Sequence, residues 1–151
     1  MATTLTAADL TVTITEAITL NGVDQGASNS MTIADINETY KRIQEILHTG
    51  GAQLILTFGA APNPVLADVR YVRITNLDNA NFVVLNFEGG ASTDYTIRLD
   101  PAASFLIVSD AAGGGVVDYC DISGVTLEDL TSINAYADTA TVPLEIFVAS
   151  A

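Results

Sequence analysis

The chain is poor in the side chains that most nucleophilic and metal sites use: its 151 residues include one cysteine, one histidine and no tryptophan. With Cys120 alone, no disulfide can form within the chain, so the predicted fold does not depend on an oxidising compartment. A cysteine nucleophile needs a histidine base nearby, and the carboxylates of Asp118 and Asp121 oppose a reactive thiolate. We interpret Cys120 as partly buried and unreactive, and His48 as a side chain that hydrogen-bonds the last carbonyls of a helix.

Cationic side chains are also scarce, because 5 lysines and arginines stand against 18 acidic residues, for a net charge of −13. Phosphate neutralisation needs clustered cations, so the sequence predicts no nucleic-acid partner. An anionic membrane surface would repel the chain, and its apolar runs are far shorter than the ~20 residues that span a bilayer. Such acidity instead favours solubility and docking on basic protein surfaces. The cations are Lys41, Arg42, Arg70, Arg73 and Arg98.

Motifs of common enzyme classes are missing from the sequence. It contains no HExxH, CxxC, P-loop or GxSxG pattern, and the glycines of 113–115 lack the lysine of a phosphate-binding loop. Carboxylate pairs of the glycosidase kind usually come with aromatic side chains for sugar stacking, which are few here. The sequence therefore predicts a protein that is not an enzyme, with no catalytic residue.

Two groups of polar side chains have the composition of a calcium site. Asn76, Asp78 and Asn81 form an N-x-D-x-x-N turn, and three aspartates surround the glycine loop. Calcium needs about six to eight oxygen ligands, and no EF-hand pattern supplies them. Asn and Asp in turns more often bond their own backbone, so we favour turn chemistry over a metal site and predict no cofactor. The three aspartates are Asp110, Asp118 and Asp121.

Period-two alternation of apolar residues indicates strands over most of the chain. The first expected strand covers 10–20, with a bend near Glu16-Ala17, and Asn21-Gly22 opens a polar loop to Ser30. The eight or nine strands predict an all-β, single-domain antiparallel β-sandwich, jelly-roll-like, with at most one or two short helices. Residues 1–8 are expected to form a flexible arm, and 9–151 the sandwich. The other strands are expected at 53–58, 69–77, 82–87, 95–99, 105–108, 133–137 and 142–148.

Three local patterns leave the secondary structure or packing open. Apolar residues at 33, 36, 40, 43 and 47 recur at helical spacing, and Gly50-Gly51 follows, which favours a helix over 32–47 unless tertiary contacts make 40–47 a strand. A second helical turn is expected over 126–132. Pro143 predicts that its strand lies at a sheet edge or begins there. Strands 69–77 and 82–87 are apolar on both faces, so either a neighbouring subunit or loop, or a helix of the same chain, covers them.

With these elements placed, the chain resembles small virion structural proteins of tailed phages, especially aquatic and cyanobacterial ones. The segments that carry the resemblance are framework segments: Asn21-Gly22, 40–43 (YKRI), 71–85, 101–106 and 144–150. The resemblance implies a non-enzymatic structural role and makes 40–47 more strand-like than helical.

The first functional hypothesis is a capsid decoration, or cement, protein on the outer surface of the virion. It binds across subunits of the major capsid protein as a homo-oligomer, a trimer or dimer, through contacts in 1–9, 21–30 and 59–68. The N-terminus lacks the basic and apolar regions of a signal peptide, so synthesis in the host cytoplasm is expected. The alternatives are a tail or neck component (tube, adaptor or fibre base) and, in another class, a carbohydrate-binding β-sandwich.

Overall fold

The computed structural model describes residues 6–90, 94–108 and 128–151. Within these ranges the chain forms strands and turns and no helix, which confirms the predicted all-β class. No helix that could cross a membrane occurs in these ranges. The interpretations of Cys120, of the aspartates at 110, 118 and 121 and of the glycine loop at 113–115 concern residues outside them.

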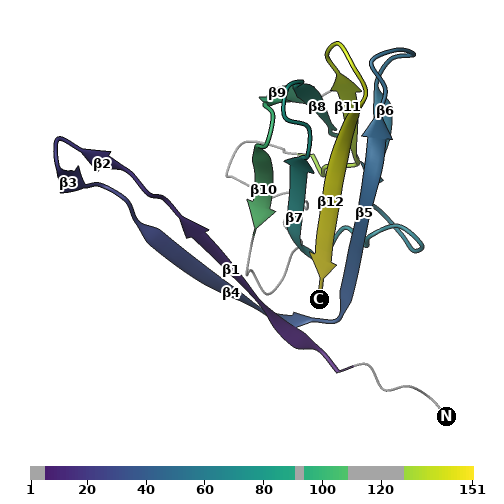
Figure 1. Cartoon of the computed structure of the whole chain (residues 1–151). Coiled ribbons are helices and arrows are strands. Elements are labelled where there is room, and N and C mark those ends of the chain that lie inside the picture. Colours follow the sequence, from purple (N-terminus) through teal and green to yellow (C-terminus); the bar gives the residue numbers. More distant parts are fainter. Residues whose placement is uncertain (1–5, 91–93, 109–127) are drawn as a thin grey trace.

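Two four-stranded antiparallel sheets pack face to face (Figure 1). One has the order β10-β7-β12-β5 and the other the order β6-β11-β8-β9. The antiparallel pairs are nested along the chain, with β8 and β9 innermost, then β7 with β10, β6 with β11, and β5 with β12. A long hairpin rolled up in this way is a jelly roll, so the predicted sandwich is confirmed. The strands are β5 (Glu38–Ile46), β6 (Gln53–Thr57), β7 (Val69–Asn76), β8 (Val83–Glu88), β9 (Asp94–Leu99), β10 (Ser104–Val108), β11 (Ser132–Ala137) and β12 (Val142–Ser150).

The main core fills the space between the two sheets with alternate side chains of their strands. In β8, Val83, Leu85 and Phe87 are fully buried, while the residues between them are partly exposed. Phe87 stacks on Tyr95 with ring centroids 4.5 Å apart and lies 5.0 Å from the ring of Phe105 in the opposite sheet. The period-two pattern of the sequence thus places one face of each strand in the core.

The helix expected over 32–47 is wrong, because this segment forms the end of β4 (Ser28–Ile36) and most of β5. A register shift adds one residue to β4 near Asp35, whose φ is 59°. This β-bulge turns Ile33 and Ile36 to the same side although they are three residues apart. The helical spacing of the apolar residues therefore arises from a bulge and from two strands that bury different faces.

Two smaller expectations are also corrected. The described residues of 126–132 form no helical turn: they are irregular as far as Thr131, and Ser132 begins β11. Pro143 does not mark an edge strand, because β12 lies between β7 and β5. The alternative is confirmed, since Pro143 is the second residue of its strand, and its carbonyl accepts a hydrogen bond of 3.0 Å from Leu77 N.

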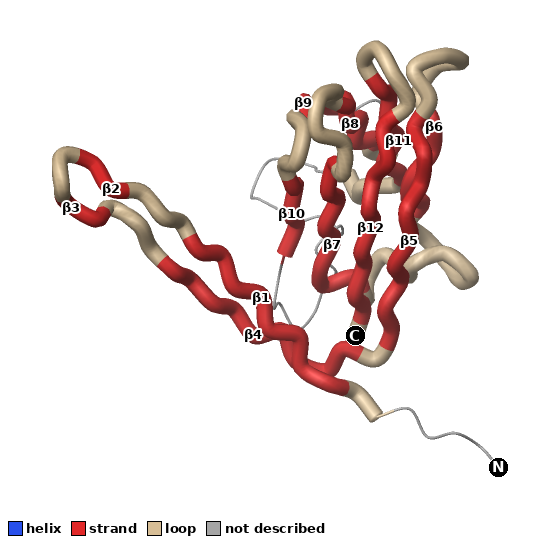
Figure 2. Tube along the Cα trace, in the orientation of Figure 1, coloured by secondary structure: helices blue, strands red, loops and turns tan. Residues whose placement is uncertain are grey.

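A two-stranded ribbon projects from the sandwich (Figures 1 and 2). Strands β1 (Ala8–Thr15) and β4 form its stem, and β2 (Thr19–Leu20) and β3 (Val23–Asp24) form its tip. Glu16 N donates to Ala27 O at 2.8 Å and Gln25 N to Ile18 O at 2.9 Å, so stem and tip are one continuous hairpin. The break between β1 and β2 lies at the predicted bend near Glu16-Ala17.

Candidate assembly surface

The ribbon stem has two chemically different faces, which follow from the alternation of Thr with Leu, Val and Ile in β1. On one face, Thr13 Oγ1 lies 2.8 Å from Ser30 Oγ, and Thr15 Oγ1 lies 3.1 Å from Ser28 Oγ. These cross-strand hydroxyl pairs bond each other. The hydroxyl face therefore requires no partner outside the ribbon.

The opposite face of the stem is apolar except for Asn29, the partner of Ile14, and it becomes more exposed with distance from the sandwich. Leu10 pairs with Ile33 at the base, where Ile33 is fully buried. Farther out, Val12 pairs with Met31, which is 40% exposed, and Ile14 is 47% exposed. The same stripe of side chains thus packs on the sandwich at one end and faces solvent at the other.

The tip carries three more exposed aliphatic side chains. Ile18, Leu20 and Val23 are 53%, 59% and 57% exposed. Leu20 and Val23 are paired across the turn formed by Asn21-Gly22, whose φ angles are 51° and 78°. Positive φ at both central residues is the geometry of a tight hairpin turn. Asn21-Gly22 was expected to open a polar loop up to Ser30, but it forms a tight turn, and the residues after it are the returning half of the ribbon.

All charged side chains of the ribbon are acidic. Asp9, Glu16, Asp24 and Asp35 are spread from the start of β1 to the bulge at the base, and the first cationic residue of the chain is Lys41. Gly26 N donates to Asp24 Oδ1 at 2.9 Å, so this carboxylate is held at the tip. The exposed aliphatic side chains therefore lie on a ribbon that bears only negative charge.

The base of the ribbon covers part of the outer face of the β10-β7-β12-β5 sheet. Ile33 and Ile36 form a second apolar cluster with Tyr71 of β7 and Ala149 of β12. Burial raises the pKa of the Tyr71 hydroxyl, and Arg73 opposes that shift. A hairpin of the same chain therefore covers the outer apolar side chains of β7, and the helix proposed as their cover is wrong.

Beside this contact, an ion-pair cluster occupies the centre of the same outer face. Glu145 Oε2 lies 2.9 Å from Lys41 Nζ, and Glu145 Oε1 accepts a hydrogen bond from Arg73 Nη2. Hydrogen bonds from Lys41 and then Arg73 lower the pKa of the Glu145 carboxyl. A cleft of about 340 Å³ separates these side chains from the stem of the ribbon. Both cations of this face are thus already paired with a carboxylate.

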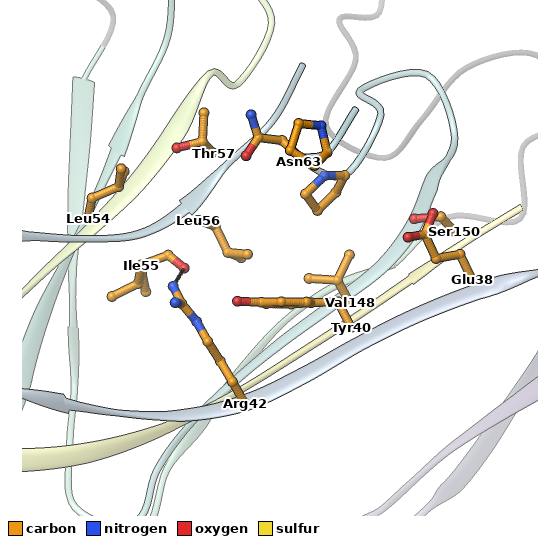
Figure 3. Close-up of a pocket in the computed structure, with 12 residues that line it drawn as sticks. Glu38, Tyr40, Arg42, Leu54, Ile55, Leu56, Thr57, Asn63, Val148 and Ser150 are labelled. Atoms are coloured by element: carbon orange, nitrogen blue, oxygen red, sulfur yellow. Dashed lines mark hydrogen bonds between the residues drawn. The ribbon is translucent and has the colours of Figure 1, made fainter. Parts of the chain in front are cut away.

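A second cleft, of about 330 Å³, lies where the edge strands β5 and β6 and the 59–68 loop meet (Figure 3). Arg42 Nη2 donates to Ile55 O at 2.5 Å, and Gln44 Nε2 donates to Leu54 O at 3.2 Å. Side chains of one edge strand thus satisfy backbone carbonyls of the other and close that side of the sandwich. Arg42 Nε and Gln44 Oε1 are buried and have no hydrogen-bond partner among the described residues.

The described residues that line this cleft include no histidine or cysteine. Tyr40 extends into it, and the Arg42 guanidinium lies 5.5 Å from the centroid of the Tyr40 ring (Figure 3). Leu56 and Val148 give it an apolar wall, with Glu38 at one end. The cleft is therefore a pocket at the edge of the sandwich, and its lining includes one cation–aromatic contact.

The turn considered as a calcium site bonds its own backbone instead. Asp78 Oδ1 accepts hydrogen bonds from Ala80 N at 2.7 Å and Asn81 N at 2.6 Å. Those backbone donors, led by Asn81, lower the pKa of the Asp78 carboxyl. Asn76 is buried, donates to Asn81 O and Leu99 O, and accepts from Asp78 N. Asn76 Oδ1 and Asp78 Oδ1 thus accept hydrogen bonds within the turn, and Asn81 Oδ1 accepts one of 2.9 Å from Thr139 Oγ1.

No group of three or more His, Cys, Asp or Glu side chains within 6–90, 94–108 and 128–151 is arranged to hold a metal ion. His48 follows β5, and its carbonyl accepts a hydrogen bond of 3.2 Å from Tyr136 Oη. The helix-capping role expected for the His48 side chain is wrong, because β5 replaces the helix.

The segments predicted to contact a partner are divided by the structure between the ribbon and the sandwich. The described end of 1–9 begins β1, and 21–30 contains the tip and the start of β4, so these two segments belong to one ribbon. The loop 59–68 lies apart, at the edge cleft. The aliphatic stripe was not predicted as a contact surface, because the alternation in 10–20 is equally typical of a strand within the sandwich.

Comparison with known proteins adds no family to these observations: no protein-family model matches the chain, and no curated protein does.

Proposed function

We propose that the protein is a structural component of a phage virion, most specifically a capsid decoration protein that stabilises the head by binding across major capsid protein subunits. The observation that carries this proposal is the projecting ribbon with its exposed aliphatic stripe. Exposed apolar surface of this kind usually marks a protein interface. The ribbon is thus suited to binding within an assembly.

The sandwich supports the same proposal by analogy. Jelly rolls recur in viral capsid proteins and also in lectins, so the fold alone does not choose a function. The net charge of −13 opposes contact with packaged nucleic acid and favours the outer surface of a shell. A decoration protein stabilises the shell because it binds the assembled lattice and not the separate subunits.

Cryo-electron microscopy of purified particles that contain this chain tests the proposal directly. Density for the jelly roll on the outer capsid surface, with the ribbon inserted between capsid subunits, is the expected result. Particles without such density, or a side-chain-dependent turnover of a substrate by the purified chain, would contradict it. Light scattering after gel filtration is the accompanying measurement, and a trimer or dimer is expected.

The ribbon also favours a second candidate, a tail or neck component. A projecting arm that binds the next copy in a head-to-tail manner closes a ring when the rotation between copies permits it. This candidate predicts cyclic oligomers in solution and density at the neck or tail of the particle. A carbohydrate-binding jelly roll is the alternative of another class, and binding on a glycan array would support it.

A further inference from the structure

We infer that the ribbon docks into an apolar groove of a different protein, and that lysine and arginine side chains border this groove. The inference rests on the proposed function and names the chemistry of the surface that the chain recognises. The docking face is the aliphatic stripe formed by Ile14 and Met31 on the stem and by Ile18, Leu20 and Val23 at the tip.

The docking face is identified by its continuity with the apolar contact between the ribbon and the sandwich. At the base, the stripe packs through Ile33 and Leu10 against Tyr71 of the sandwich. Beyond the base, side chains of the same alternation remain exposed, whereas the hydroxyl pairs Thr13–Ser30 and Thr15–Ser28 satisfy one another. The apolar face therefore gains from being covered and the hydroxyl face does not.

Charge excludes a second copy of this chain as the favoured occupant. The charged residues of the ribbon are all acidic, and the rest of the chain still has more acidic than basic residues although it holds all 5 cations. Lys41 and Arg73 on the outer face of the sandwich are already paired with Glu145. A second copy therefore offers the carboxylates of the ribbon a surface of net negative charge, whereas a groove bordered by cations complements them.

The shape of the ribbon is set before it binds, which lowers the entropic cost of docking. The tight turn at Asn21-Gly22 fixes the tip, and the bulge at Asp35 fixes the angle at which the ribbon leaves the sandwich. Ile33 and Ile36 hold the base in place. The stripe is therefore presented as a preformed edge rather than as a flexible tail.

Co-sedimentation of the purified full chain with capsid shells from which it has been removed tests this inference. Leu20→Ala removes an exposed side chain, so folding is retained, and we expect the apparent Kd to rise about tenfold or more. Thr15→Ala, on the hydroxyl face, is the matched control and should bind like the unmodified chain. Circular dichroism of each variant verifies the fold.

A charge series tests the predicted border of the groove. Glu16→Gln should weaken binding and reduce its dependence on NaCl, because one carboxylate fewer faces the cations. Glu45→Gln makes the same change on the exposed side of β5 and should have no such effect. Photo-crosslinking from position 20 in assembled particles should label a segment of another protein that contains lysine or arginine.

The possible outcomes separate this inference from the proposed function. If the unmodified chain does not bind the shells, both are overturned. If it binds, but Leu20→Ala and Glu16→Gln bind as well as their controls, only the docking role of the ribbon is overturned. Crosslinks from position 20 to a second copy of this chain would overturn the stated partner in the same way.

Discussion

Replacing Ile33 with alanine should release the ribbon from the sandwich and leave the sandwich folded. Ile33 is fully buried, but in the small outer cluster with Ile36, Tyr71 and Ala149 and not in the core between the sheets. The two clusters lie on opposite faces of β7 and β12. A cavity in the outer cluster therefore removes contacts that hold the ribbon and none that hold the two sheets together.

The expected magnitude follows from the position of this cluster. Truncation of a buried isoleucine to alanine costs about 2–5 kcal/mol, with smaller values where the surroundings can collapse. Partly exposed Leu10 borders the cluster and can move toward the gap, so we expect about 2–3 kcal/mol. At about 1.4 kcal/mol for each factor of ten, this is about 30- to 140-fold weaker protection of the ribbon amides.

Hydrogen exchange measured by mass spectrometry gives this protection strand by strand. Amides of β1 and β4 should exchange faster in Ile33→Ala, while those of β8 and β11 should not change. Ile14→Ala, at a position that is 47% exposed on the same strand pair, should leave all four strands unaffected. Unchanged exchange in β1 and β4, or equal acceleration in β8 and β11, would refute the separation of the two clusters.

Three further predictions concern single side chains. Glu145→Gln should lower the free energy of unfolding at neutral pH by about 1–2 kcal/mol. Because the pKa of Glu145 is lowered in the folded chain, its stabilisation is present above the ordinary pKa of 4.5 and is lost on acidification. In urea titrations the free energies of unfolding of the variant and the unmodified chain should therefore become equal in acid, and a constant difference would contradict this. Asn76→Ala removes hydrogen bonds to two carbonyls and from one amide and should cost about 2–4 kcal/mol in the same assay, whereas an unchanged midpoint would count against these bonds. Asp35→Val places a β-branched residue at a φ of 59° and should lower stability by about 1–3 kcal/mol, with Asp35→Gly tolerated; equal melting temperatures for both would disprove the strain.

Strict alternation made the strands of the sandwich predictable. In β8 and β12, side chains two residues apart are apolar and face the core between the sheets, so period and environment agree. The segment 32–47 was not predictable in this way, because the bulge at Asp35 shifts the pattern by one residue. A spacing of three then results from two extended strands and resembles one face of a helix.

The candidate surface could be predicted only in part, for a related reason. The turn at Asn21-Gly22 and the apolar stripe of β1 are both readable in the sequence. Alternation shows that one face of a strand is apolar, but it does not distinguish a face covered by the same chain from one left open. That distinction depends on where Ile33 and Ile36 anchor the ribbon, which is a property of tertiary packing.

The direct continuation of β4 into β5 determines how a pull on the ribbon would be borne. Only Asn37 separates the two strands, and Asn37 N donates to Ser150 O at 3.0 Å. From there, β5 runs antiparallel to β12 from the Glu38–Ser150 pair to the Ile46–Val142 pair. Tension on the arm is therefore transmitted to the sandwich at the Glu38–Ser150 end of this ladder. The sandwich is thereby built as a mechanical anchor for the element that extends from it.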